Sequence, residues 1–171
     1  MADHTPLKRL TRIALLLALT LAVQSLRLPT PVTGPLVNFM LIFSTALVGP
    51  AGGALIGSIT PGAALLLGVI PPLLAPAIPF IMTGNALFCL SYGLSRRLFK
   101  TGAPPGLALG ALPGLVLGAL LKFAVIAGAA RFLLEIPSPA SEALALPQLL
   151  NALIGGVAAL IVSFKWGRFL T

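Results

Sequence analysis

The side chain with the clearest chemical potential is Lys122, which lies in a long apolar stretch, Gly106 to Leu134, that contains no acidic residue. A charged side chain at the depth of a bilayer core costs about 2.5–3.5 kcal/mol on insertion scales. Such a cost is accepted where the charge faces a water-filled cavity, a partner charge or an anionic ligand. A carboxylate ligand fits an unpaired ammonium best, because lysine acts as a point charge.

Other polar side chains in apolar stretches could complete a binding site around Lys122. Amides orient a ligand in a pocket of this kind, and aromatic rings such as those of Phe88 and Tyr92 stack on it. Gln148 and Asn151 are three residues apart and share a helix face. The residues that we expect to bind a substrate are Lys122, Asn38, Asn85, Asn151, Gln148 and Arg27.

Each of these residues also has a purely structural interpretation. The three asparagines could hydrogen-bond between helices, Phe88 could belong to the core, and Arg27 could be an interfacial charge that snorkels. Gln24 and Arg27 could reach the rim of a pocket. Arg131 follows Lys122 by nine residues, which places it on the opposite face of an ideal helix.

Composition identifies the broad class of protein. The 171 residues are 58% hydrophobic and 8% charged, with a mean hydropathy of +1.08. A soluble domain of this size could not bury so much apolar surface, so we expect an all-α integral membrane protein. The net charge of +8 is dispersed rather than gathered in a nucleic-acid patch. A single Cys89, a single His4 and three acidic residues make a metal site, a cofactor site or a catalytic cluster unexpected.

Prolines and glycines divide the chain into apolar spans. We expect six transmembrane helices in one domain, at about 10–28, 36–48, 51–70, 77–94, 106–134 and 144–164. The second span is short and ends at Gly49-Pro50, and Thr60-Pro61-Gly62 interrupts the third.

Basic residues supply the orientation of these spans. Three clusters flank them, and the positive-inside rule puts all three in the cytoplasm. An even number of spans must then separate consecutive clusters, so the short second span must cross. Both termini are expected inside, and Lys122 lies slightly to the outer side of its span. No clear cleavage site follows the first span, which argues against a signal peptide. The clusters are Lys8, Arg9 and Arg12; Arg96, Arg97 and Lys100; and Lys165 and Arg168.

Small residues at a spacing of four mark faces where helices can approach closely. The first span carries Ala14, Ala18 and Ala22, and this stripe could face either another helix of the chain or a partner protein. Internal packing suffices to explain the glycine stripes, which are Gly49, Gly53 and Gly57, and Gly106, Gly110, Gly114 and Gly118.

In combination, these features resemble the substrate-binding S component of an energy-coupling factor (ECF) vitamin transporter. The resemblance covers essentially the whole chain. It rests on the six spans with both ends inside, the alanine stripe, and the stretches Gly34-Pro-Leu-Val-Asn-Phe-Met and Leu47-Val-Gly-Pro-Ala-Gly-Gly-Ala-Leu-Ile-Gly. It implies a high-affinity subunit in a prokaryotic cell membrane that binds a small vitamin or micronutrient near the outer face.

The same resemblance implies partners for this chain. The alanine face of helix one would dock onto a transmembrane coupling subunit, which joins two ATP-binding-cassette ATPases. The chain itself has no Gly-x-x-x-x-Gly-Lys-Ser/Thr loop, so ATP hydrolysis is expected on those partners. The nickel and cobalt branch fits poorly, because position two is Ala2 and His4 is isolated.

Two other classes of function remain as alternatives. A structural or assembly protein of the cell-shape scaffold kind would need no pocket, and its Lys122 would contact another protein. A membrane enzyme or an autonomous proton-coupled transporter would need clustered catalytic groups or an intramembrane acid, and the spans contain neither.

Overall fold

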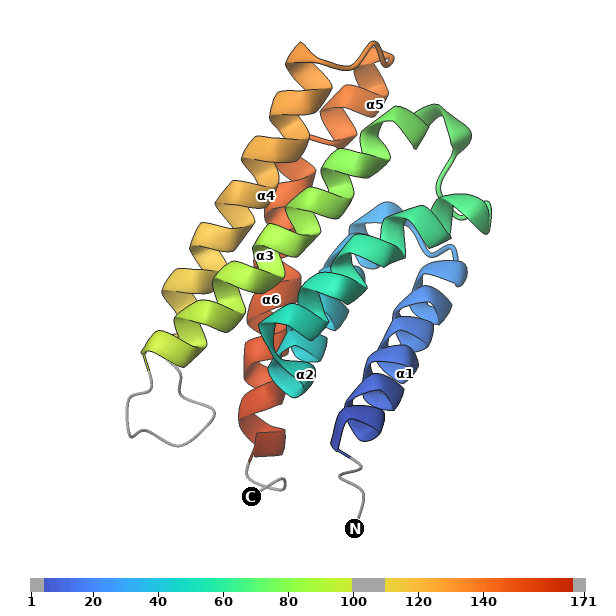
Figure 1. Ribbon diagram of the computed structural model, residues 1–171. Coiled ribbons are helices and arrows are strands. Elements are labelled where there is room, and N and C mark those ends of the chain that lie inside the picture. Colours follow the sequence, from blue (N-terminus) through green and yellow to red (C-terminus); the bar gives the residue numbers. More distant parts are fainter. Residues whose placement is uncertain (1–4, 100–109, 168–171) are drawn as a thin grey trace.

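The structure, a computed structural model, describes residues 5–99 and 110–167, and every regular element in this part of the chain is helical (Figure 1). The prediction of an all-α fold is therefore confirmed. The elements are α1 (Thr5–Ser25), α2 (Thr30–Leu66), the short 3₁₀ helix η1 (Pro72–Ala77), α3 (Ile78–Leu98), α4 (Leu112–Phe132), α5 (Ser138–Ala143) and α6 (Leu146–Gly167).

Four segments of the described chain are long and apolar enough to cross a membrane. They are Thr30–Leu66, Pro72–Leu98, Leu112–Phe132 and Ser138–Ser163. Helix α1 has 21 residues but is not in this set, because Lys8, Arg9 and Arg12 occupy its first half. These apolar helices indicate a multi-pass membrane protein.

Helix α2 is a helical hairpin rather than one straight rod. Gly49 has φ 84° and ψ 172°, a conformation that is essentially restricted to glycine. The chain reverses there, so that Thr30 and Ile70 line the same cavity while Gly49 approaches Arg97 at the other end of the bundle. The reversal falls between the expected spans 36–48 and 51–70 (Figure 1).

An arginine from α3 stabilises this reversal. Pro50 has no N–H group, so it cannot bond to the carbonyl of Ala46, four residues earlier. Nη1 of Arg96 donates a hydrogen bond of 3.1 Å to that carbonyl. The basic cluster that we interpreted as a topology signal therefore also closes the turn of the hairpin.

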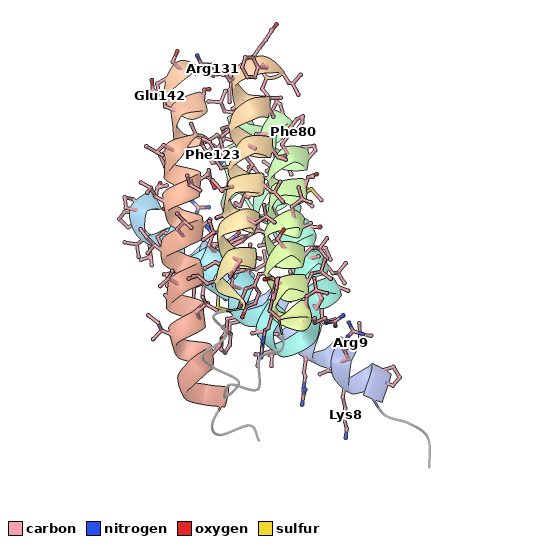
Figure 2. All side chains as sticks on the ribbon, turned by 90° about the vertical axis from the view of Figure 1, so that its left-hand side faces the viewer. Lys8, Arg9, Phe80, Phe123, Arg131 and Glu142 are labelled. Carbon is pink, nitrogen blue, oxygen red and sulfur yellow. The ribbon has the colours of Figure 1, made fainter. Side chains whose placement is uncertain are left out.

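The two ends of the bundle differ in charge. Helices α1 and α4 begin, and α3 and α6 end, at the same end, which also holds the reversal of α2 (Figure 1). We call this the basic end, because Lys8, Arg9, Arg96 and Arg97 lie there; Figure 2 labels the first two, with Arg131 and Glu142 at the opposite end. Lys100 and Arg168 lie outside the described residues, as does the side chain of Lys165.

Glycines let α3, α4 and α6 pack closely. A Cβ atom at Gly118 of α4 would lie 2.9 Å from the carbonyl oxygen of Phe88, and one at Gly114 would lie 2.5 Å from that of Ser91. Gly156 of α6 packs on Leu115 of α4 in the same way. The internal-packing interpretation therefore holds for Gly114 and Gly118, whereas Gly106 lies outside the described residues.

The helix bounds differ from the expected spans mainly at loop-facing ends. Helix α4 begins at Leu112 rather than at residue 106, and the second half of α2 ends at Leu66 rather than at residue 70. Lys122 consequently lies at the middle of α4, ten residues from Leu112 and ten from Phe132.

Candidate ligand-binding site

A cavity of about 460 Å³ lies in the half of the bundle away from the basic end. Its walls come from the end of α1, both halves of α2, α3, α4 and α6, and from the segment that joins α2 to η1. All six residues that the sequence nominated for substrate binding line this one cavity: Arg27, Asn38, Asn85, Lys122, Gln148 and Asn151.

Lys122 forms the inner part of this wall. Its side chain is buried, with 3% exposure, and its Nζ donates a 2.6 Å hydrogen bond to Oδ1 of Asn38. The same nitrogen lies 5.7 Å from the centre of the Phe88 ring, within the range of a cation–π contact. The described residues around the cavity include no carboxylate, so an amide and an aromatic ring are the groups that stabilise the charge.

Asn38 holds Lys122 in place. Its Nδ2 donates a 2.8 Å hydrogen bond to the carbonyl of Gly34, one turn earlier in α2. Because lysine can only donate, the oxygen of the Asn38 amide must be the atom that faces Nζ. Both ends of the amide are thus engaged, and the ammonium keeps two N–H groups beyond the one that it shares with Asn38.

Asn85 replaces a backbone hydrogen bond that is missing in the second half of α2. Pro61 lacks an N–H group, so the carbonyl of Gly57 loses its helical partner. Nδ2 of Asn85 donates a 3.2 Å hydrogen bond to this carbonyl. Its Oδ1 is buried and has no hydrogen-bond partner within the described parts of the chain.

Helix α6 contributes two more amides. Asn151 is buried, with 8% exposure, and packs against Gly34, where a Cβ atom would overlap its amide group. Gln148 lies one turn earlier and is partly exposed to the cavity. Glycine at position 34 therefore brings the first half of α2 close to α6 and gives Asn151 access to the cavity.

The end of α1 forms the rim. Arg27 has a positive φ of 48° that terminates the helix, and its Nη2 donates a 3.1 Å hydrogen bond to the carbonyl of Gly68. This contact joins the α1–α2 connection to the segment after α2. One turn earlier, Gln24 is buried, and its Oε1 has no hydrogen-bond partner among the described residues.

Several residues considered from the sequence lie outside the cavity. Phe88 and Tyr92 are buried in the core, with Phe88 beneath Lys122. Arg131 is exposed and does not line the cavity, as the nine-residue spacing predicted. No group of three His, Cys, Asp or Glu side chains that could hold a metal occurs in the described residues, and His4 lies outside them.

Sequence reasoning missed the residues that shape the cavity rather than bond within it. Gly34 and Pro61 both line it, and each acts through a neighbour: Gly34 admits Asn151, and Pro61 orients Asn85. The available signal was a proline inside the expected span 51–70 and a glycine just before the expected span 36–48, and we interpreted both only as breaks in the apolar pattern.

The alanine stripe lies on the outer face of α1. Ala14, Ala18 and Ala22 are exposed, whereas Leu16 and Thr20 are buried on the face that packs on α2. The stripe therefore does not serve packing among the residues that the structure describes.

Comparison with protein-family models, with curated proteins and with solved structures finds no match to this chain. The argument for a function therefore rests on the cavity and on the pattern of the sequence.

Proposed function

We propose that this chain is the substrate-binding S component of an ECF-type importer, and that its ligand is a small water-soluble vitamin or related micronutrient bearing a carboxylate. The observation that carries the proposal is the buried Lys122 at the inner wall of a cavity whose described lining residues include no carboxylate. A ligand anion would supply the missing counter-charge. The volume of about 460 Å³ is in the usual range for small-molecule sites.

The proposal includes an orientation in a prokaryotic cell membrane. The basic end faces the cytoplasm by the positive-inside rule, and both termini lie there. The two halves of α2 and the helices α1, α3, α4 and α6 make six crossings. The cavity, away from the basic end, then faces the side from which an importer captures its ligand.

Ligand binding to purified protein tests the proposal. Small molecules that remain bound through purification are identified by mass spectrometry, and affinity is then measured for the wild type and for Lys122→Met. We expect the variant to lose at least tenfold in affinity, since a charged hydrogen bond contributes about 1.5–3 kcal/mol. Lys8→Met, at the exposed basic end, is the control. Unchanged affinity in Lys122→Met would contradict the assignment of the site.

The partner complex is tested separately on the exposed face of α1. In the proposed assembly, Ala14, Ala18 and Ala22 contact a coupling subunit that carries two ABC-type ATPases. We expect Ala18→Leu to reduce co-purification of that module while ligand affinity stays unchanged. Ala124→Leu places the same bulk at an exposed alanine of α4 and is the control. Equal co-purification of both variants would count against this docking face.

A structural or assembly protein remains the second candidate, and the Lys122–Asn38 hydrogen bond favours it, because this bond partly satisfies the charge without a ligand. In that case no small molecule would accompany the purified protein. Lys122→Met would then change stability or association with a morphogenetic partner, but no ligand affinity.

A further inference from the structure

We propose that the ligand is an amphiphile whose acid group lies at Lys122 and whose body is saturated and apolar, directed toward η1 and away from the basic end. This inference rests on the proposed function and deepens it, because it specifies the part of the ligand that the carboxylate leaves open. It is drawn from the order of polar and aliphatic side chains along the helices that line the cavity.

Polar and aliphatic side chains form two layers in this half of the bundle. On three elements, a polar residue of the cavity has an aliphatic residue four positions away, on the side farther from the basic end, where α3 and α6 begin and α4 ends (Figure 1). In α3 and α4 this spacing corresponds to about 6 Å along the helix axis. The pairs, with the aliphatic residue first, are Ile81 and Asn85 on α3, Ile126 and Lys122 on α4, and Leu144 and Gln148 at the start of α6.

The aliphatic side chains form one continuous surface. Leu74, Ile81 and Leu144 all line the cavity, and they belong to a single apolar cluster that also contains the buried Ile126. We call these three lining residues the aliphatic layer. Leu74 and Ile81 are partly exposed, so a bound molecule can contact them and remove apolar surface from water.

Gly84 of α3 brings this surface directly beside Lys122. A Cβ atom at Gly84 would lie 3.2 Å from Cγ of Lys122 and 3.2 Å from Cδ1 of Ile126. The alkyl stem of the lysine and the apolar cluster therefore pack on the same point of α3. A ligand with its acid group at Nζ of Lys122 needs to extend by only about one helical turn to reach the aliphatic layer.

The lining residues favour a saturated body over an aromatic one. The described residues that line the cavity include no aromatic side chain, and Phe88, beneath Lys122, is fully buried in the core. An aromatic ligand gains part of its affinity from stacked or edge-to-face contacts with other rings, which these residues do not offer. Saturated carbon needs only burial, which contributes about fourfold in affinity per methylene.

A series of small acids tests the inference on the full-length protein in lipid nanodiscs. Affinity is measured by ligand-observed NMR titration, and nanodiscs without protein give the background from partition into lipid. We expect heptanoate to bind about tenfold more tightly than pentanoate, and pentanoate more tightly than propionate. In 6-hydroxyhexanoate a hydroxyl replaces the terminal methyl group of heptanoate, and this probe should bind about tenfold more weakly than heptanoate.

A matched pair of rings tests the saturated character of the body. The probes 4-cyclohexylbutyrate and 4-phenylbutyrate have the same length and the same acid group, and they differ in whether the ring is saturated. We expect the cyclohexyl compound to bind at least threefold more tightly. Tighter binding of the phenyl compound would overturn this part of the inference.

Two neighbouring leucines of η1 provide a matched pair of variants. Leu74 lines the cavity, whereas Leu73 is 55% exposed and does not line it. Leu74→Ala should weaken heptanoate binding about threefold to tenfold and leave propionate binding unchanged, and Leu73→Ala should change neither. Because the readout is the ratio between two ligands on one variant, a general loss of folded protein does not imitate it. Lys122→Met should weaken the binding of every probe.

The outcomes separate the inference from the proposed function. Binding that depends on Lys122 but does not increase with chain length would overturn the inference and leave a substrate-binding subunit. Equal effects of Leu74→Ala and Leu73→Ala would overturn the role of the aliphatic layer. Absence of binding by every probe would also overturn the inference, and a metabolite recovered by mass spectrometry from the purified protein would then still support the proposed function. Recovery of no metabolite, together with no bound probe, would overturn both.

Discussion

At the scale of single residues, the structure gives Lys122 a combination of partners that reduces the cost of burying its charge. Asn38 accepts its hydrogen bond, Phe88 lies beneath it, and a cavity adjoins it. A neutral amide cannot neutralise an ammonium, so the site retains a positive charge that a ligand can use. In the proposed function, Asn38 therefore positions Lys122, and Lys122 is the group that would contact the ligand.

The bond between Lys122 and Asn38 can be measured as a coupling energy. Asn38→Leu should lower the free energy of unfolding in detergent by about 1–3 kcal/mol, because it leaves a buried ammonium without its acceptor. The double variant Asn38→Leu/Lys122→Met should recover most of this loss, since no unpaired charge remains. Thermal or denaturant unfolding of the two single variants and the double variant provides the cycle. Simple additivity of the two single effects would show that the bond contributes nothing.

At the scale of elements, helix α2 determines the architecture of the site. Its reversal at Gly49 brings Thr30 and Ile70 to the same cavity, and its prolines free two carbonyls that α3 then satisfies. Asn85 and Arg96 of α3 each donate to one of these carbonyls. These two hydrogen bonds, together with contacts between apolar side chains, therefore hold α3 against the hairpin.

The reversal depends on glycine at position 49. Gly49→Ala should destabilise the protein by about 1–3 kcal/mol, because φ 84° with ψ 172° is strained for any side chain. Gly62→Ala, in the second half of α2, adds the same methyl group where no atom lies within 4 Å, and it should be neutral or mildly stabilising. The midpoint of thermal unfolding in detergent distinguishes them. Equal midpoints would indicate that the reversal does not require glycine.

Helix α4 offers a second matched pair of glycines. At Gly114 a Cβ atom would lie 2.5 Å from the Ser91 carbonyl oxygen, so Gly114→Ala should force α3 and α4 apart and cost about 1–3 kcal/mol. Gly128→Ala adds a methyl group into open space on the same helix. The unfolding midpoint of Gly128→Ala should match or exceed that of the wild type. If Gly128→Ala unfolded at a lower temperature than Gly114→Ala, the close packing of α3 and α4 at Gly114 would be contradicted.

At the scale of the whole molecule, the bundle has a basic end and a cavity-bearing half away from it. Lys8 and Arg9 mark one end and Glu142 the other (Figure 2). Membrane insertion with the basic end inside would expose the cavity to the exterior. The proposed import function requires this orientation.

Cysteine labelling in intact cells tests the orientation. The native Cys89, which is fully buried, is first replaced by alanine. Single cysteines are then introduced at exposed positions in this background. Glu142→Cys should react with a membrane-impermeant maleimide in intact cells, and Lys8→Cys should react only after permeabilisation. Labelling of both positions in intact cells would contradict the proposed topology.

The sequence by itself determined the class of protein, the helical fold and the residues from which a site could be made. Polar side chains in apolar spans are costly and few, so they could be nominated from the sequence, and all six nominated residues line one cavity. The tertiary structure decided which of these residues bond to one another. Asn38 and Lys122 are 84 residues apart, and Asn85 pairs with a carbonyl freed by a proline in another helix. Hydropathy measures how each segment partitions into lipid, but the contacts between helices depend on how their surfaces fit together.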